Sequence, residues 1–187
     1  IDHTGRLPLL SRAGYKGPVY GTAATGATAE LLLLDSAGLQ AGDVERANRR
    51  RERAGLEPLE PPYDEDDVRE ALSRFKPLPY DEPAAVAPGV SVELVEAGHV
   101  LGSASIKLRV EEGGVEKTVV FSGDVGPRGA AILRDPGRIS GADLVFLEST
   151  YGDRDHRPIA DTAAEFGEVV RAAARRRGKI LIPSFAV

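Results

Sequence analysis

The stretch VSVELVEAGHVLGSASIKLRVEEGGVEKTVVFSGD, residues 90–124, decides the fold class of this chain. Apolar and polar residues alternate at positions 90–94 and again at 106–110, which is the period of a half-buried β-strand. The residues EEGG at 111–114 supply a turn, and the apolar strand 118–121 follows that turn. This stretch therefore predicts an antiparallel meander in the middle of the chain.

The residues that precede the meander predict a strand and several helices. A short strand is predicted within 16–22, and a helix over 28–37, where strong helix formers are concentrated. Residues 43–54 predict a separate exposed helix, because arginines are frequent there and large apolar residues are few. A further helix is predicted over 65–75, capped at its start by Asp64.

The residues that follow the meander continue the alternation of strand and helix. A strand is predicted over 144–147, a helix over 162–176 and a further strand over 179–182. The helix opens with a capping-box pattern, Thr162 to Glu165. Its expected buried face consists of Phe166, Val169, Val170 and Ala173. The whole pattern predicts an α/β protein, with a layered sheet sandwich and helices outside.

Composition narrows the chemistry that is open to the chain. The 187 residues include no cysteine, which excludes a disulfide framework, a thiolate metal site and a cysteine nucleophile. A reducing, cytoplasmic location is expected. The net charge of −5 argues against a wholly basic nucleic-acid-binding surface. The sequence has no apolar run long enough to cross a membrane and no signal-peptide pattern at its start, so neither membrane insertion nor secretion is expected. The first residue is Ile1 and methionine is absent, so we expect the chain to begin inside a longer protein.

Histidines and carboxylates at strand ends are the candidate site residues. His99 lies between Gly98 and Gly102 after a predicted strand, and its alternative role is that of a surface-loop histidine. Asp124 follows the strand 118–121 and could equally be an ordinary turn residue. Imidazole and carboxylate groups are the zinc ligands that remain when no thiolate is present, so His99, Asp124 and the adjacent pair Asp2 and His3 together favour a metal site.

Three further positions complete the set of candidates. Asp2 and His3 are adjacent, and they could both point into one site only from a loop or an irregular helix start. Glu148 ends an apolar strand, where it could orient a metal ligand, transfer a proton or simply belong to a turn or cap.

Five ordered segments carry a resemblance to a known family. The segments IDHTGRLPLL, AGHVLGSAS, VVFSGDVG, LESTYGDRDH and IPSFAV resemble those of the β-CASP ribonucleases of the metallo-β-lactamase superfamily. That group includes the endonuclease subunit of the pre-mRNA 3′-end cleavage machinery. The resemblance implies a partial metallo-β-lactamase αβ/βα sandwich over 1–177, and the start of a β-CASP domain over 178–187. It also implies that the chain is an internal fragment.

The resemblance also implies roles for individual residues. Asp2 and His3 match the last two positions of the family's His-x-His-x-Asp-His signature and would serve the second of two zinc ions. His99 would be a ligand of the first zinc, and Asp124 the carboxylate that bridges both. Asp2 and Glu148 are expected to take part in catalysis. His156 is expected on the substrate side of the site.

The implied function is that of a zinc-dependent ribonuclease, which hydrolyses phosphodiester bonds of single-stranded RNA by a two-metal hydroxide mechanism. The remaining metal ligands and the β-CASP histidines lie outside this sequence, so the fragment alone is expected to be inactive. A homodimer is left open, and no membrane partner is expected. The alternatives are a hydrolase of small esters or thioesters with the same fold and a non-catalytic scaffold subunit of an RNA-processing complex.

Overall fold

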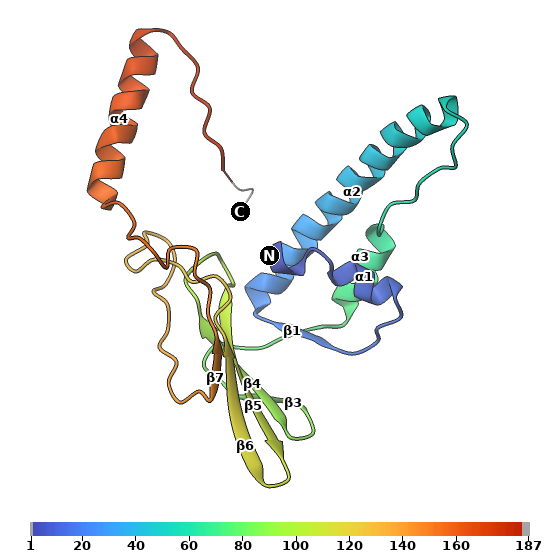
Figure 1. The fold of residues 1–187 in the computed structure, drawn as a ribbon, viewed down its shortest axis with the longest axis vertical. Helices are drawn as coiled ribbons and strands as arrows, with labels where there is room; N and C mark the ends of the chain where they lie inside the picture. The colour runs from blue at the N-terminus through green and yellow to red at the C-terminus, as the bar shows by residue number, and fades with distance from the viewer. Residues whose placement is uncertain (1, 185–187) are drawn as a thin grey trace. The chain divides into compact units, whose positions relative to one another are not determined.

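The computed structural model describes residues 2–184 of the chain, which fall into two compact units that meet between Leu147 and Glu148. The first unit contains two sheets and all but one of the described helices, and the second contains a single long helix (Figure 1). The mixture of helices and strands confirms the α/β class that the sequence predicts. None of the helices in the described range is both long and apolar enough to span a membrane.

The predicted meander is confirmed as the centre of a five-stranded sheet with the order β3-β4-β5-β6-β7. Strands β3 (Ala84–Ala87), β4 (Val90–Glu96), β5 (Ala104–Glu112) and β6 (Val115–Phe121) are antiparallel neighbours. Gly113 and Gly114 link β5 to β6 with φ values of 61° and 78°, and two consecutive positive φ angles are what a tight hairpin of the favoured twist requires. The glycine pair therefore fixes the register of the hairpin.

The last strand of this sheet, β7 (Leu144–Phe146), lies beside β6 in parallel orientation. Phe121 and Phe146 pair across the two strands, and their rings stack with centroids 4.8 Å apart. This pairing confirms the strand predicted over 144–147 and closes the first unit after the long loop 122–143. The start of that loop carries Asp124.

Helix α2 (Ala23–Arg53) corrects the prediction of two separate helices over 28–37 and 43–54. One continuous helix of 31 residues crosses Gly38 and Gly42. Each glycine costs about 1 kcal/mol relative to alanine, which is too little to break a helix whose neighbours are strong helix formers. Its N-terminal half packs Ala29, Leu33 and Ala37 into the core cluster, while its arginine-rich end is largely exposed, as predicted.

The elements packed against α2 position its start. The short helix α1 (Leu7–Arg12) and α3 (Glu65–Ser73) pack together, and β1 (Val19–Gly21) pairs in parallel with β2 (Phe75–Pro77). Asp64 caps α3 as predicted, in a reciprocal capping box with Asp67. The predicted helix was too long, because Phe75 belongs to β2.

The second unit contains α4 (Ile159–Arg175), which begins before the predicted Thr162. The predicted capping box is wrong. Pro158 occupies the N-cap position, the Thr162 hydroxyl donates to the Pro158 carbonyl at 3.3 Å, and Glu165 pairs with Arg157 at 2.6 Å. Of the predicted buried face only Ala173 is buried, whereas Phe166 and Val169 are half-exposed.

Residues 179–182 do not form the predicted strand in this structure, since they pair with no other strand among the described residues. A strand is stabilised through its ladder hydrogen bonds, and this segment has no ladder. The IPSFAV segment extends beyond the described residues. The proposed domain boundary between residues 177 and 178 stays a prediction.

Candidate metal centre

The loop that follows β4 carries His99 and is fixed by its own hydrogen bonds. The backbone amides of His99 and Val100 donate to the Ser103 hydroxyl at 3.0 and 3.2 Å, and Gly98 donates its amide to the Glu96 carboxylate at 2.9 Å. Gly98 and Gly102 have φ values of 64° and 88°, in the left-handed region that favours glycine. The local sequence thus folds back on itself and presents an imidazole at the end of the strand.

The first turn of α2 holds the same loop from the other side. The hydroxyls of Thr22 and Thr25 both donate to the carbonyl of Gly102, at 3.0 and 2.7 Å. A Cβ atom on Gly102 would lie 2.6 Å from the backbone nitrogen of Thr25, so the close approach of the loop to the helix requires glycine. Thr22 also caps the helix by accepting from the Thr25 amide. The helix start is therefore tied to the His99 loop.

A tyrosine also holds the His99 loop through a hydrogen bond. The Tyr80 hydroxyl donates to the Ser103 carbonyl at 2.9 Å. Burial, with the negative charge of Glu96 adding to it, raises the pKa of Tyr80 above its ordinary value, so the phenol stays a donor at neutral pH. A hollow of about 390 Å³ lies beside the loop, and its lining includes Tyr80, Glu96 and Arg134.

The loop after β6 packs directly against the loop that carries His99. The Gly126 amide donates to the Ala97 carbonyl at 2.9 Å. A Cβ atom on Gly126 would overlap the carbonyl of Gly98 and lie 2.7 Å from the backbone nitrogen of His99. The two backbones can approach this closely only because position 126 is glycine. Asp124, two residues earlier, is thereby held beside His99.

The structure brings three of the predicted ligands together. His3, in the 3₁₀ turn Asp2–Thr4, places Nε2 at 3.5 Å from Asp124 Oδ2, and His99 places Nε2 at 3.7 Å from the same oxygen. Both separations exceed an ordinary N–H···O hydrogen bond. They approach the spacing of about 3.3–3.4 Å between two ligand atoms that each lie about 2.0–2.1 Å from a tetrahedral zinc ion. The donor types and their pairwise spacing therefore fit part of a zinc site.

The set of ligands is not complete within the described part of the chain. There, no group of three or more His, Asp or Glu side chains is arranged so that it could hold a metal ion by itself. The side chain of Asp2, the fourth predicted ligand, lies outside what the structure describes. His3, His99 and Asp124 are all partly exposed, so further ligands could approach them from solvent.

The other two candidates belong to the second unit and are described within it. Glu148 follows β7 and is partly buried. The ring of His156 lies against that of Tyr151, with centroids 3.8 Å apart, and Arg154 lies 5.5 Å from the centre of the same tyrosine ring. The substrate-side role of His156 stays a prediction. Its contact with Tyr151 was not predicted from the sequence.

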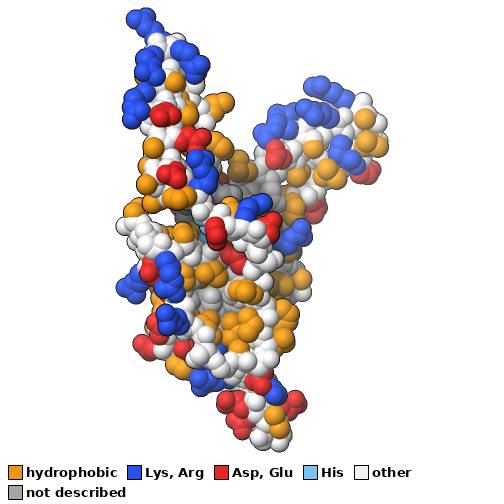
Figure 2. Space-filling model, turned by 60° about the vertical axis from the view of Figure 1, so that its left-hand side comes forward, with side chains coloured by type: hydrophobic (Ala, Val, Ile, Leu, Met, Phe, Trp, Pro, Cys, Tyr) orange, Lys and Arg blue, Asp and Glu red, His pale blue; other side chains and the backbone are white. Residues whose placement is uncertain are grey.

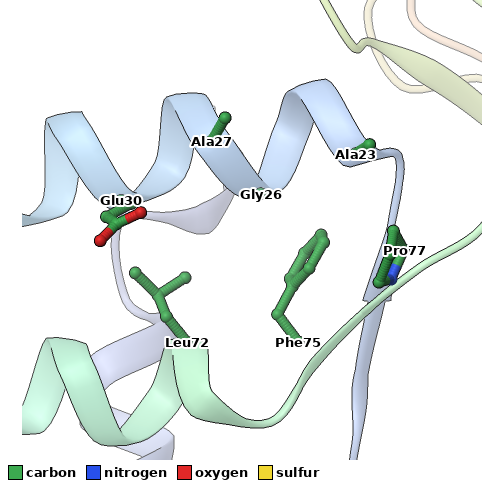
Figure 3. A pocket seen from close by; sticks show the side chains of 7 residues that line it. All are labelled: Ala23, Gly26, Ala27, Glu30, Leu72, Phe75 and Pro77. Atoms are coloured by element: carbon green, nitrogen blue, oxygen red, sulfur yellow. The ribbon is translucent and has the colours of Figure 1, made fainter.

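A different cavity belongs to the first unit, and no candidate site residue lines it. It measures about 280 Å³ and is bounded by the start of α2, the end of α3 and β2 (Figure 3). The ring of Phe75 lies directly against Gly26, where a Cβ atom would come within 2.6 Å of it. The lining is apolar except for Glu30, so the cavity is a packing groove between elements and offers no catalytic groups.

Comparison with known proteins gives the family of the chain. No family model matches it. All of the chain aligns with ribonuclease TTHA0252 of Thermus thermophilus at 41% identity, and with transcription termination factor FttA of Methanothermobacter thermautotrophicus at 35%. It also aligns throughout with RNase aCSPSF2 of Saccharolobus solfataricus, at 27% identity. The chain spans 38%, 27% and 34% of these three relatives. The order of the motifs and these alignments agree, and the chain belongs to the family of β-CASP ribonucleases.

Proposed function

We propose that the protein carrying this chain is a zinc-dependent ribonuclease that hydrolyses phosphodiester bonds of single-stranded RNA on a metallo-β-lactamase αβ/βα sandwich. The observation that supports this most is the convergence of His3 and His99 on one oxygen of Asp124. These residues come from three separate segments, so their approach results from tertiary packing and not from sequence proximity. The ribonuclease names of two relatives support an RNA substrate.

In this proposal the residues of the chain would hold two zinc ions. His99 would bind the first, Asp2 and His3 the second, and Asp124 would bridge both. Bound zinc would lower the pKa of water towards about 7 and offset negative charge on a phosphoryl oxygen.

The protein's own task at this site is to keep the ligands in place. The hydrogen bonds to Gly102 and Ser103 hold the His99 loop, and the Gly126 contact keeps the Asp124 loop against it. Glu148 would orient a ligand or accept a proton, and His156 would contact the RNA. A cytoplasmic location and a homodimer are retained as predictions.

The experiment compares the full-length protein with two matched variants. Asp124→Ala removes the bridging carboxylate, whereas Asp35→Ala removes an exposed carboxylate from the face of α2. Zinc content and cleavage of single-stranded RNA are measured for each. We expect two zinc ions and cleavage in the natural protein and in Asp35→Ala, and loss of cleavage in Asp124→Ala.

Two other results would redirect the assignment. Zinc binding without RNA cleavage would favour a hydrolase of small esters or thioesters with the same fold. The absence of zinc from a correctly folded protein would favour a scaffold subunit. Unchanged RNA cleavage in Asp124→Ala would refute the role given to Asp124.

A further inference from the structure

The second unit ends in a segment of uniform positive charge. Residues 169–184 contain five ionisable side chains, all of them basic, and no carboxylate. They are Arg171, Arg175, Arg176, Arg177 and Lys179, named here the basic segment. The chain as a whole carries a net charge of −5, so this cluster opposes the charge of the molecule that bears it. A local excess of one sign attracts a partner of the opposite sign.

The structure leaves this charge exposed. All five side chains are exposed, and none forms an ion pair with a carboxylate in the described part of the second unit. Arg171 and Arg175 are one helical turn apart and so lie on the same side of α4. Figure 2 shows the basic side chains gathered at the end of α4. The charge is thus available to an external ligand.

The arginine-rich end of α2 is different, although it also holds five basic side chains. Arg46 pairs with Asp43, Arg49 pairs with Glu45 at 3.3 Å, and Arg51 donates to the Glu57 carbonyl. Five carboxylates lie within residues 43–60, so the positive and negative charges there balance. The α2 cluster is therefore electrically balanced, whereas the basic segment carries an uncompensated positive charge.

We propose that the basic segment binds the phosphate backbone of single-stranded RNA, independently of base sequence and in addition to the cleavage site. The inference rests on the proposed ribonuclease function, because it takes RNA as the polyanion that this protein meets. Each phosphate contact releases condensed counterions, and for single strands each contributes about 0.7 to the slope of log K against log salt. The segment should therefore account for a measurable share of that slope.

The test neutralises three arginines at each of the two clusters in the full-length protein. The patch variant carries Arg171→Ala, Arg175→Ala and Arg176→Ala, and the control carries the equivalent changes at the exposed residues 49, 50 and 53 of α2. Both lose the same net charge, and alanine is a strong helix former, so neither α4 nor α2 should unfold. The positive-φ residue Arg177 is left unchanged. Binding of an oligouridylate is measured against NaCl concentration in an Asp124→Ala background, so that the RNA is not cut.

We expect the slope to fall by about 2 in the patch variant, as three lost phosphate contacts imply, and to stay unchanged in the control. Equal slopes in all three proteins, equal losses in both variants, or no RNA binding by the reference protein would overturn the proposal. The ribonuclease assignment fails separately, if the full-length protein with its natural Asp124 does not cleave single-stranded RNA. The two failures are therefore distinguishable.

Discussion

The substitution Gly126→Ala tests whether the contact between the two loops positions the candidate centre. The new Cβ would overlap the carbonyl of Gly98 and lie 2.7 Å from the backbone nitrogen of His99. An ordinary contact between such atoms needs about 3.5 Å or more, and the Cβ would lie 1.8 Å from the Gly98 oxygen, so the loops must separate by roughly 1.7 Å. The φ angle of Gly126 is not in the left-handed region, and the effect of the substitution is therefore steric.

The expected cost has two parts. Overpacking costs about 1–3 kcal/mol, and weakening the hydrogen bond from the Gly126 amide to the Ala97 carbonyl costs about 1 kcal/mol more. The free energy of unfolding should therefore fall by about 2–4 kcal/mol. A displacement of about 1 Å between catalytic groups can already reduce the rate about 100-fold, so RNA cleavage should fall by about that factor or more.

Urea unfolding, zinc content and RNA cleavage of the full-length protein measure these effects. The control is Gly38→Ala, an addition of the same methyl group within α2, where no atom beyond the neighbouring residues and the backbone of its own helix lies within 4 Å of the new Cβ. We expect the control to retain zinc and activity and to gain up to about 1 kcal/mol, as alanine is the better helix former. A Gly126→Ala protein that unfolds, binds zinc and cleaves RNA as the natural protein does would show that the contact between the loops does not position the centre.

Three further substitutions test the supports of the site and the fold. Tyr80→Phe removes the hydroxyl that donates to Ser103 and should lower the free energy of unfolding by about 1 kcal/mol at neutral pH. Because the pKa of Tyr80 is raised in the folded protein, its contribution to the free energy of unfolding should decline as the pH rises above about 10. Chemical unfolding at a series of pH values should then show a smaller difference in stability between the natural protein and Tyr80→Phe. The hydrogen bond from Lys117 lowers the pKa of Asp143, so the Asp143 carboxylate should stabilise the fold above about pH 4 and cease to do so as the pH falls through its pKa in the folded protein. Asp143→Asn should therefore be less stable than the natural protein above about pH 4 only, and acid unfolding of both proteins measures this. Asp64→Ala removes the cap of α3 and should cost about 1 kcal/mol in thermal or urea unfolding, and an unchanged stability would contradict the capping role.

Local patterns predicted the elements that depend on local chemistry. Alternation of apolar and polar residues at 90–94 and 106–110 predicts two neighbouring strands, and the glycine pair at 113–114 predicts the tight turn to the next strand. These signals are local, and the meander that they predict is confirmed. The break predicted within α2 was wrong, because glycine is only a mild helix breaker and packing of the N-terminal half decides the outcome. The capping box at Thr162 was also wrong, since Pro158 begins the helix earlier.

Contacts between distant segments could not be predicted from local pattern. Thr22 lies 80 residues before Gly102, and nothing near either residue indicates that their hydroxyl and carbonyl meet. Thr22 was predicted only as the end of a short strand, and its N-cap role and its contact with the His99 loop appear only in the structure. The pairing of His99 with Asp124 was predicted from their places at strand ends, and a ligand role for His3 from the family motifs, but no local pattern gave their approach to one oxygen. Their role as metal ligands stays a prediction.

Anomalous X-ray scattering at the zinc absorption edge, from crystals of the full-length protein grown with zinc, tests the central claim most directly. We expect anomalous peaks within about 2.0–2.2 Å of Nε2 of His99, of Nε2 of His3 and of the Asp124 carboxylate. Zinc bound elsewhere, or the absence of any peak beside these three side chains in the folded protein, would contradict that claim.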